Sequence, residues 1–324
     1  MYEIYNANHS KSVKLTKIVS LNHLEAMQVR SGGALLDHGM YGCIFTSSLH
    51  CKHKTPKEHI EDKEHPPISK LIRTDYAEIE FKISSLIRQI PLWKNYFAVS
   101  ESMCTPAKQQ TEQDLVKCPV LEEHPLSDFR ILSMTYHGVP IDAFHIDFRT
   151  FDSIKFISHL LEAGALLNLF GVVHRDIHQG NILVDRHNVP RIIDFNLSVF
   201  AKESVTEDDL LHQHVIQIGQ EPPDATIVNA VAHGHDGIRV MESILSKKTI
   251  LKKIQTLLGI TPQQMKASLY QFYQQSKSVK DGDSAAWFKS YWTKYDSWGI
   301  GINIVFQIIK WSISSAFSIE SHKA

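Results

Sequence analysis

The feature that most limits the possible folds is a run of polar residues set between a helix and a pair of strands. Residues 151–170 carry apolar side chains at helical spacing. Two short stretches, NILV (181–184) and RIIDF (191–195), have the composition of strands joined by a tight turn. The segment between the helix and these strands, residues 173–181, reads VHRDIHQGN. A polar stretch flanked in this way predicts a loop that presents side chains at one end of a hairpin.

Three side chains of this region have the chemistry that phosphoryl transfer from a nucleotide requires. That reaction needs a carboxylate to orient the attacking hydroxyl and oxygen ligands to hold Mg²⁺ on the phosphates. Asp176 fits the first role. Asn181 and Asp194 fit the second, because the two ends of the hairpin direct them to one site.

The order of these residues matches a known motif. The pattern H-R-D-x-x-x-x-N from His174 to Asn181, followed by Asp194-Phe195, resembles the catalytic core of the eukaryotic-type protein kinases. This resemblance implies an α+β, two-lobed protein-kinase-like fold. Its N-lobe would be small and β-rich with one helix, and its C-lobe mainly helical and shortened at the C-terminus.

The N-terminal half contains segments that resemble the nucleotide-binding parts of these kinases. DHGMYGCI (37–44) is similar to the glycine-rich loop that covers the phosphates, with Gly39, Gly42 and Ile44 at positions of the family pattern. Glycine has no Cβ, so backbone N–H groups can approach phosphate oxygens closely there. Lys70, in a strand-like stretch, resembles the lysine that contacts the α- and β-phosphates.

A helix after this strand supplies the usual acidic partner of the lysine. We expect Thr74 or Asp75 to cap it, with Glu78 completing a capping box. Its apolar stripe is predicted from residues at helical spacing: Tyr76, Ile79, Ile83, Leu86 and Ile90. Glu78 and Glu80 are both candidates for the partner of Lys70. We take Glu80, because it lies on the face of the apolar residues that follow it.

The resemblance also predicts an adenine site where the two lobes join. Met134 would lie at the back of the pocket, and the backbone of Thr135 and Tyr136 would bind the edge of the base.

Two later segments fit the C-lobe of the same pattern. Pro222-Pro223-Asp224 falls where kinases have A-P-E. Asp296, before Trp298, resembles the aspartate that begins the buried central helix and hydrogen-bonds the catalytic loop. The apolar run 298–317 is long enough for a membrane helix, but Lys310 and several polar residues interrupt it. We therefore expect a buried helix and no membrane contact.

These segments divide the chain into three parts. Residues 1–30 are predicted to be an N-terminal lead-in, and residues 31–136 the nucleotide-binding N-lobe. Residues 137–324 form the C-lobe, which contains a helical insertion at 238–295 and the central helix at 296–317.

Within the superfamily, the chain most resembles the serine/threonine protein kinases encoded by large nucleocytoplasmic DNA viruses. The matching pieces are GMYGCIF (39–45), EFKIS (80–84), Ile90-Pro91 with Tyr96-Phe97, and the double proline before Asp224. This closer resemblance implies a viral protein.

The sequence also departs from the kinase pattern. His178 stands where a lysine usually steadies the transferred phosphate, and aminoglycoside- and choline-kinase-like relatives have a histidine there. Asn196 replaces the glycine of D-F-G. The chain ends soon after the central helix, so we expect the last helices of the usual large lobe to be missing.

Charge and cysteine usage restrict the partners and the compartment. The chain has 34 Lys and Arg against 35 Asp and Glu, a formal net charge of −1, which predicts no nucleic-acid partner. The four cysteines form no C-x-x-C pair: Cys43, Cys51, Cys104 and Cys118. The N-terminus has no apolar signal region, so we expect reduced thiols and an intracellular, cytoplasmic protein, in the host cytoplasm or virion if viral. A metal at Cys51, His50 and His53 is an alternative to a loop cysteine, but no second cluster would complete the site.

The resulting hypothesis is an ATP-dependent serine/threonine protein kinase. Its cofactors would be ATP and Mg²⁺, or Mn²⁺ in its place, and its substrate a protein. The catalytic residues would be Asp176, Asn181, Asp194 and Lys70, with Glu80 fixing the lysine. Two alternatives stay open: a small-molecule phosphotransferase of the aminoglycoside/choline-kinase-like type, and a catalytically silent kinase-like binding module.

The segment after Asp194 contains hydroxyl groups that a regulatory kinase could phosphorylate: Ser198, Ser204 and Thr206. The acidic residues 207–209 would repel a phosphate there, and could replace it by pairing with Arg175. We therefore expect activity without phosphorylation of this segment.

Overall fold

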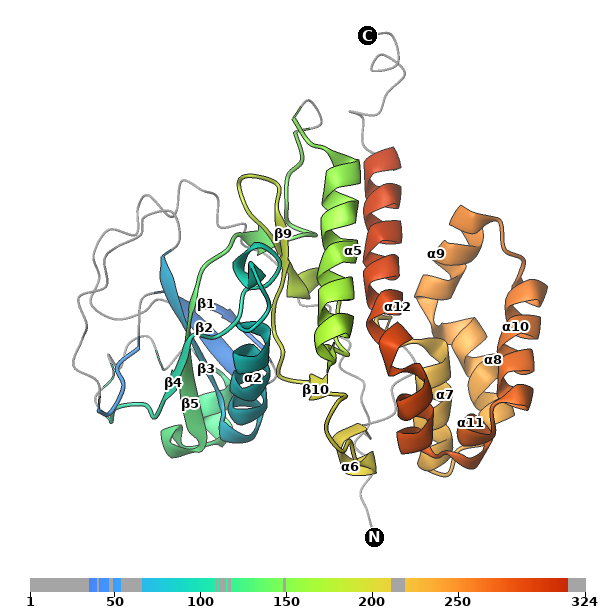
Figure 1. Ribbon diagram of the computed structural model, residues 1–324, viewed down its shortest axis with the longest axis horizontal. Helices are drawn as coiled ribbons and strands as arrows, with labels where there is room; N and C mark the ends of the chain where they lie inside the picture. Colours follow the sequence, from blue (N-terminus) through green and yellow to red (C-terminus); the bar gives the residue numbers. More distant parts are fainter. Residues whose placement is uncertain are drawn as a thin grey trace. The chain divides into compact units, whose positions relative to one another are not determined.

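The computed structural model describes residues 35–39, 41–46, 49–53, 66–108, 110, 115, 118–147, 150–210 and 219–313. The described chain is α+β, with a five-stranded antiparallel sheet and one long helix first and mainly helices afterwards (Figure 1). The sheet has the strand order β1-β2-β3-β5-β4. Its strands are β1 (Leu35–His38), β2 (Gly42–Thr46), β3 (Pro67–Arg73), β4 (Ser102–Cys104) and β5 (Phe129–Thr135).

The central strand β3 carries Lys70 in the middle of the sheet. Lys70 pairs with Ile44 on β2 and with Leu132 on β5. Strand β3 is almost wholly buried. Its residues Pro67 to Arg73 pair with β5, and Ile68 to Ile72 also pair with β2. A side chain in this position is therefore held by ladder hydrogen bonds on both sides.

Helix α2 (Thr74–Ile87) follows β3 directly, and its buried face differs from the predicted stripe. The buried residues are Ala77, Glu80, Ile83, Ser84 and Ile87. Ile79, which the apolar periodicity assigned to the core, is 42% exposed. The prediction was wrong because this helix turns Glu80 and Ser84 inward, and the inward position of Glu80 belongs to the candidate site.

The predicted cap of this helix is also wrong. Arg73 is the N-cap residue, and no side chain caps the helix there. Thr74 instead donates its hydroxyl to the backbone carbonyl of Asp128, at 2.7 Å. The first turn is thus fixed to the segment that leads into β5, not by a capping box.

Two disulfides join the strands and loops of the sheet region. Cys43 on β2 is bonded to Cys118, and Cys51 is bonded to Cys104 at the end of β4. The prediction of reduced thiols is therefore wrong: all four cysteines are paired, because the fold brings together residues 75 and 53 positions apart. The thiol argument for a reducing compartment, and the alternative of a metal at Cys51, both lose their basis.

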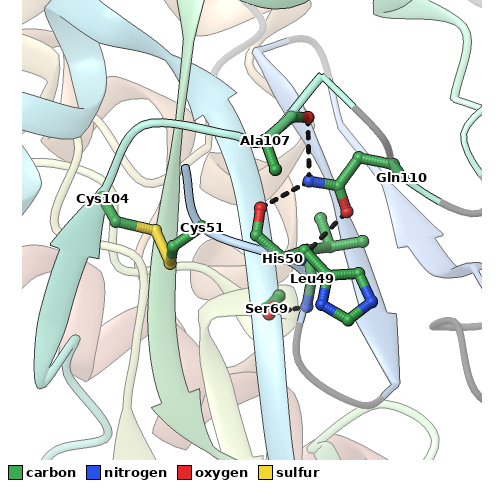
Figure 2. Close-up of a disulfide and its surroundings, with 7 residues drawn as sticks. All are labelled: Leu49, His50, Cys51, Ser69, Cys104, Ala107 and Gln110. Carbon is green, nitrogen blue, oxygen red and sulfur yellow. Dashed lines mark hydrogen bonds between the residues drawn. A yellow bond between two sulfur atoms is a disulfide. The ribbon is translucent and has the colours of Figure 1, made fainter. Parts of the chain in front are cut away.

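The second disulfide lies beside the buried side-chain amide of Gln110, which hydrogen-bonds the backbone of His50 as a neighbouring strand would (Figure 2). The side-chain oxygen of Gln110 accepts a hydrogen bond from the backbone N–H of His50 at 2.9 Å, and its nitrogen donates to the carbonyl of the same residue. The Ser69 hydroxyl accepts from the backbone N–H of Leu49 at 2.9 Å. These bonds fasten the loop before Cys51 to the sheet.

The remainder of the chain is mainly helical, with one three-stranded and one two-stranded sheet of short strands. Its strands are β6 (Val139–Pro140), β7 (Val172–Val173), β8 (Ile182–Val184), β9 (Pro190–Ile192) and β10 (Val199–Phe200). Its helices are α5 (Ser153–Phe170), α6 (Glu207–Leu210), α7 (Pro223–Ala232), α8 (Gly237–Lys247), α9 (Thr249–Leu258), α10 (Pro262–Gln275), α11 (Lys277–Asp281) and α12 (Ser284–Ile313), and a short α4 (Val120–Glu123) precedes β5. The amphipathic helix predicted at 151–170 is confirmed as α5, which Asp152 caps and Gly171 ends.

Helix α12 lies between two hydrophobic cores. Ile300 and Trp311 pack into the core that α5 and α2 share, whereas Ile302 and Tyr295 pack into the core of α7, α8 and α9. The helix begins at Ser284, so the predicted boundary at 296 between an insertion and a central helix is wrong. No helix in the described part of the chain is long and apolar enough to cross a membrane.

Candidate active site

The candidate site is built on a loop between β7 and β8 whose backbone is unusual. Arg175 has φ 70° and Asp194 has φ 65°, a left-handed conformation that non-glycine residues rarely adopt. Such conformations persist only where surrounding contacts hold them, and they gather at functional sites. Two of the four non-glycine residues with positive φ in the described chain thus lie in the predicted motif.

Helix α12 fixes the backbone of this loop through side-chain hydrogen bonds. The two carboxylate oxygens of Asp296 accept hydrogen bonds from the backbone N–H groups of His174, at 2.7 Å, and Arg175, at 2.9 Å. This is the contact that the kinase resemblance predicted for Asp296. Asn303 adds a bond from its amide to the carbonyl of Ile177 at 3.0 Å.

Gly299 explains how the helix and the loop come so close. A Cβ at this position would lie 3.0 Å from both the Cβ and the carbonyl oxygen of Ile177. Burial raises the pKa of Asp296, which the hydrogen bonds from the loop partly counteract. The loop is therefore fixed by a buried carboxylate, an amide and a close helix contact.

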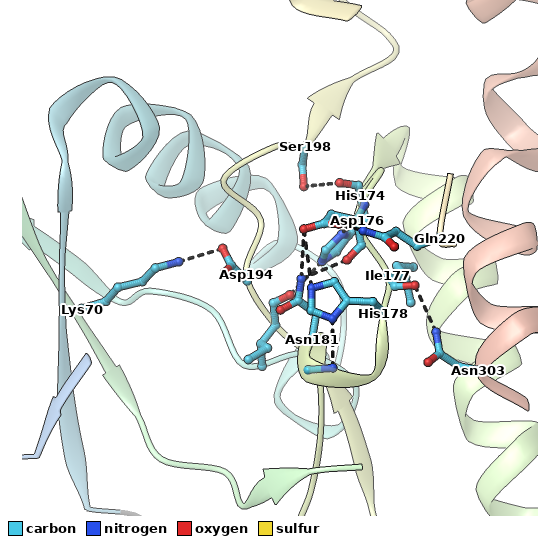
Figure 3. A network of polar contacts seen from close by, with 12 residues as sticks. Lys70, His174, Asp176, Ile177, His178, Asn181, Asp194, Ser198, Gln220 and Asn303 are labelled. Atoms are coloured by element: carbon cyan, nitrogen blue, oxygen red, sulfur yellow. Dashed lines mark hydrogen bonds and ion pairs between the residues drawn. The ribbon is translucent and has the colours of Figure 1, made fainter. Parts of the chain in front are cut away.

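Asp176 and Asn181 face each other at the tip of this loop (Figure 3). The amide nitrogen of Asn181 donates to the backbone carbonyl of Asp176 at 2.9 Å and to its carboxylate at 3.3 Å. His178 Nε2 lies 3.8 Å from the same carboxylate, and His178 Nδ1 accepts from the backbone N–H of Gly180 at 3.0 Å. Because Asn181 donates through its nitrogen, its amide oxygen remains to bind a cation.

Lys70 joins the sheet to this loop. Its ammonium lies 2.7 Å from the carboxylate of Glu80 on α2 and 2.7 Å from the carboxylate of Asp194. Figure 3 shows Lys70 and Asp194 reaching toward each other from opposite sides of the site. Of the two candidate glutamates, Glu80 is the one that contacts the lysine, whereas Glu78 is exposed.

The electrostatics of this triad follow from its burial. Burial alone lowers the pKa of Lys70, but the carboxylates of Asp194 and Glu80 outweigh it and raise the pKa, so the ammonium stays charged. Burial raises the pKa of Glu80 to about 7, although Lys70 opposes this shift. Burial likewise favours protonated Asp194, but the charge of Lys70 outweighs it and lowers the pKa of that carboxyl. The site therefore holds a charged lysine beside an ionised aspartate.

Phe195 fixes the direction of its neighbour Asp194. Its ring is 1% exposed and packs edge-on to Phe97 at 6.1 Å and against His174 at 4.6 Å between ring centroids. His174 Nε2 lies 2.8 Å from the carbonyl of Ile193. With the aromatic ring anchored in the core, the adjoining carboxylate is turned to Lys70.

The two glycines of the predicted phosphate loop differ in their surroundings. At Gly42, a Cβ would lie 2.1 Å from the carbonyl oxygen of Leu71, so the sheet itself requires glycine there. At Gly39, nothing lies within 4 Å of the corresponding position, and its N–H donates to the Gly42 carbonyl at 2.9 Å. Only Gly39 therefore has the open surroundings that the phosphate-loop argument assumed.

The predicted adenine site lies at the end of β5. Met134 packs with Leu132 and Ile72 in a small core on one face of the sheet. Thr135 is the last residue of β5, opposite Pro67. The backbone N–H of Tyr136 donates to the carbonyl of Pro66 at 2.9 Å, so this group already has a partner within the sheet edge.

The acidic side chains fit a magnesium site only together with a phosphate ligand. Among the described residues, no group of three His, Cys, Asp or Glu side chains could hold a metal ion alone. Mg²⁺ in nucleotide sites, however, is bound by one or two protein oxygens, the substrate phosphates and water. The side chains of Asn181 and Asp194 carry oxygens of this kind.

Arg175 contacts the segment after Asp194 in a way that the sequence did not predict. Its guanidinium donates to the backbone carbonyls of Asp209, at 2.6 Å, and Leu210, at 2.8 Å. The Asp209 carboxylate is instead bonded to the N–H and hydroxyl of Thr206, at 2.8 and 2.6 Å, which lowers its pKa. Ser198 is buried and donates to the carbonyl of His174, so it is not accessible as a phosphorylation site.

Sequence reasoning missed two residues at the end of this segment. Gln220 donates to the carboxylate of Asp176 at 2.7 Å, and Glu221 is buried against the hydroxyl of Thr226 at 2.6 Å. Near the start of α7, Glu221 is therefore more buried than Asp224, the residue at the acidic position of the A-P-E pattern. Gln220 lies 44 residues from Asp176 and belongs to no motif, so no sequence signal pointed to it.

A scan against protein-family models finds no family that matches the chain, and a search of curated proteins finds no match either. An assignment of function therefore depends on the side chains of this site and their geometry.

Proposed function

We propose that the chain is an ATP-dependent phosphotransferase with a protein-kinase-like fold, which transfers the γ-phosphate to serine or threonine hydroxyls of proteins. The observation that carries the proposal is the ion-paired triad of Lys70, Glu80 and Asp194 beside the hydrogen-bonded pair of Asp176 and Asn181. Lys70 and Glu80 come from a strand and the helix that follows it, and the other three side chains come from a loop and hairpin much later in the chain. They combine a cation for phosphates, oxygens for Mg²⁺ and a carboxylate for a hydroxyl proton.

The chemical step follows from the position of each group. An acceptor hydroxyl hydrogen-bonded to Asp176 attacks the γ-phosphorus, and its proton passes to the Asp176 carboxylate as the new P–O bond forms. The bond from the γ-phosphorus to the bridging oxygen breaks, and ADP leaves with that electron pair. Lys70, kept charged by Asp194 and Glu80, stabilises the phosphate oxygens.

Mg²⁺ held by Asn181 and Asp194 would neutralise the developing charge on the phosphates. Binding of the nucleotide would also give the Lys70 ammonium new oxygen partners in place of Asp194. Glu80 remains on the other side of the lysine, so the ammonium keeps its direction during this exchange.

A small-molecule phosphotransferase is the second candidate, and His178 favours it. The ring accepts a hydrogen bond at Nδ1 from Gly180, so the neutral imidazole carries its proton on Nε2, toward Asp176. A neutral donor at this position differs from the lysine of protein kinases. It suits a histidine-containing site of the aminoglycoside- and choline-kinase-like type.

Transfer of label from γ-labelled ATP with Mg²⁺ tests the proposal and separates the candidates. Wild-type protein is incubated with casein, with an aminoglycoside or with choline. Phosphoserine or phosphothreonine in casein supports the protein kinase, whereas label only on a small alcohol supports the second candidate. No label on any acceptor, together with binding of nucleotide, would instead identify a silent binding module and overturn the proposal.

The matched variants are Asp176→Asn and Asp236→Asn. The first keeps the shape of the side chain but removes the proton acceptor, and we expect a loss of about 10²- to 10⁴-fold in turnover with nucleotide binding retained. The second removes a carboxylate that caps α8, far from the site, and asparagine still caps a helix. Equal turnover of both variants would show that Asp176 has no catalytic part.

A further inference from the structure

The strongest hydrogen bond to the Asp176 carboxylate comes from outside the catalytic loop. Gln220 Nε2 donates to Asp176 Oδ1 at 2.7 Å. Within the described residues, the other oxygen, Oδ2, has longer contacts, with Asn181 Nδ2 at 3.3 Å and His178 Nε2 at 3.8 Å. Since hydrogen bonds weaken with distance, Gln220 has the largest influence on how this carboxylate is turned.

The residues on both sides of Gln220 are anchored. The carbonyl of Gly219 accepts from the indole N–H of Trp298 on α12, at 3.0 Å. Glu221 is 2% exposed and accepts from the hydroxyl of Thr226 on α7, at 2.6 Å. Gln220 is therefore held between two fixed points, as expected for a residue that orients another side chain.

We propose that Gln220 is a positioning residue, which holds the Asp176 carboxylate in the orientation that receives the acceptor hydroxyl. This inference rests on the proposed function and extends it. Helix α12 fixes the backbone of the catalytic loop through Asp296 and Asn303. Gln220 does the same for the one side chain that must meet the acceptor.

The chemistry of an amide suits this task. A carboxylate offers about four lone-pair sites, so one N–H bond to Oδ1 leaves room for a hydroxyl. The amide is also neutral. A lysine or arginine in its place would stabilise the ionised carboxylate by its charge and weaken it as a proton acceptor.

Gln220→Leu removes the hydrogen-bond donor and leaves an apolar side chain of similar size. We expect kcat to fall about 10- to 100-fold because the carboxylate loses its orientation, with KM for ATP unchanged. The matched control is Gln255→Leu, which removes an amide bonded to the Met265 sulfur on helices away from the site. The control should keep full turnover. Equal kcat for the two variants would overturn the inference.

A second variant separates orientation from space filling. Gln220→Glu has nearly the shape of the wild-type side chain, but it replaces the donor by a carboxylate that repels Asp176. We expect a loss at least as large as that of Gln220→Leu, and the variant also serves if Gln220→Leu does not fold. Wild-type turnover in Gln220→Glu would show that the position needs only volume, and would overturn the inference.

A double-mutant cycle shows whether Gln220 acts through Asp176. Once Asp176→Asn has removed the proton acceptor, adding Gln220→Leu should cost less than about twofold in residual turnover. An undiminished cost in that background would mean a structural role and would overturn the inference alone. Absence of transfer by wild-type protein to every acceptor would overturn the proposed function, and the inference with it.

Discussion

Among the described residues, two regions each bury one lysine, and the pKa of that lysine shifts in opposite directions in the two regions. Lys70 in the sheet is 8% exposed and lies 2.7 Å from each of two carboxylates. Lys248, between α8 and α9, is 0% exposed, and its ammonium donates to the hydroxyl of Thr226 at 3.1 Å. The two carboxylates raise the pKa of Lys70 against the effect of burial. Burial lowers the pKa of Lys248 to about 8, although Glu221 and Asp224 oppose this shift.

The difference teaches how a buried charge is used. In the proposed function Lys70 would meet phosphates, and its two carboxylate partners keep it charged for that role. A lysine that supports packing needs one hydrogen bond, and it loses its charge more easily. The regions also differ in their covalent bonds: both disulfides lie in the sheet region, and the cores of the helical region are held by packing.

Replacing the two lysines in turn should give the largest contrast. Lys70→Met should reduce kcat/KM for ATP about 10²- to 10³-fold, because the phosphates lose their cation. Lys248→Met should keep wild-type turnover per folded molecule. Steady-state kinetics with circular dichroism as a fold check measures both. An unchanged rate in Lys70→Met would move the phosphate-binding role to another lysine.

Reduction of the disulfides should destabilise the sheet region next. Cross-links between residues 75 and 53 positions apart correspond to about 4 kcal/mol each in the chain-entropy description. Urea unfolding with and without a reductant measures the change, and hydrogen exchange should show strands β2 to β5 opening before α5 and α12. Cys43→Ser/Cys118→Ser and Cys51→Ser/Cys104→Ser separate the two bonds.

Thiol labelling of the unfolded, unreduced protein provides the direct check. No cysteine should react before reductant is added. Four reactive thiols would contradict the pairing and restore the reduced state that the sequence had suggested.

The surroundings of Lys70 also show which parts of the site could be predicted from the sequence. The motif with Asp176, Asn181 and Asp194 is local, so the sequence could place Asp176 in a loop and Asn181 and Asp194 at the two ends of one hairpin. The choice of Glu80 over Glu78 also came from helical periodicity, and the structure brings Glu80 to Lys70. The same periodicity misassigned Ile79, because it cannot show when a polar residue takes the inward position.

Contacts between distant segments could not be predicted in this way. Four cysteines allow three pairings, and nothing in their spacing selects the observed one or the oxidised state. Gln220 meets Asp176 across 44 residues of sequence, because Trp298 on α12 holds the neighbouring Gly219 and not because of a motif. The requirement for glycine at position 42 came from the neighbouring strand, whereas the family pattern suggested phosphates.

Lys248 should make stability depend on pH in the alkaline range. Its folded pKa of about 8 lies below the ordinary value of 10.5, so between these values the unfolded chain binds more protons. Stability of the wild type should therefore rise with pH through this window, by up to about 3 kcal/mol relative to Lys248→Met. The exposed neighbour provides the control, because Lys247→Met should keep the wild-type pH dependence. Parallel curves for wild type and Lys248→Met would contradict the lowered pKa.

The smallest effect is expected in the segment that runs between the two regions. Arg175 already holds this segment through the backbone carbonyls of Asp209 and Leu210, without a phosphate. Thr206 caps the short helix α6 through hydrogen bonds with Asp209. Its replacement should therefore destabilise this helix by about 1 kcal/mol. Ser204→Ala/Thr206→Ala and phosphatase-treated wild-type protein should both keep turnover within about twofold, since neither change removes the contacts of Arg175. A large loss in either sample, with Asp176 intact, would show that phosphorylation orders the segment and that the sheet and helical regions are coupled by a phosphate switch.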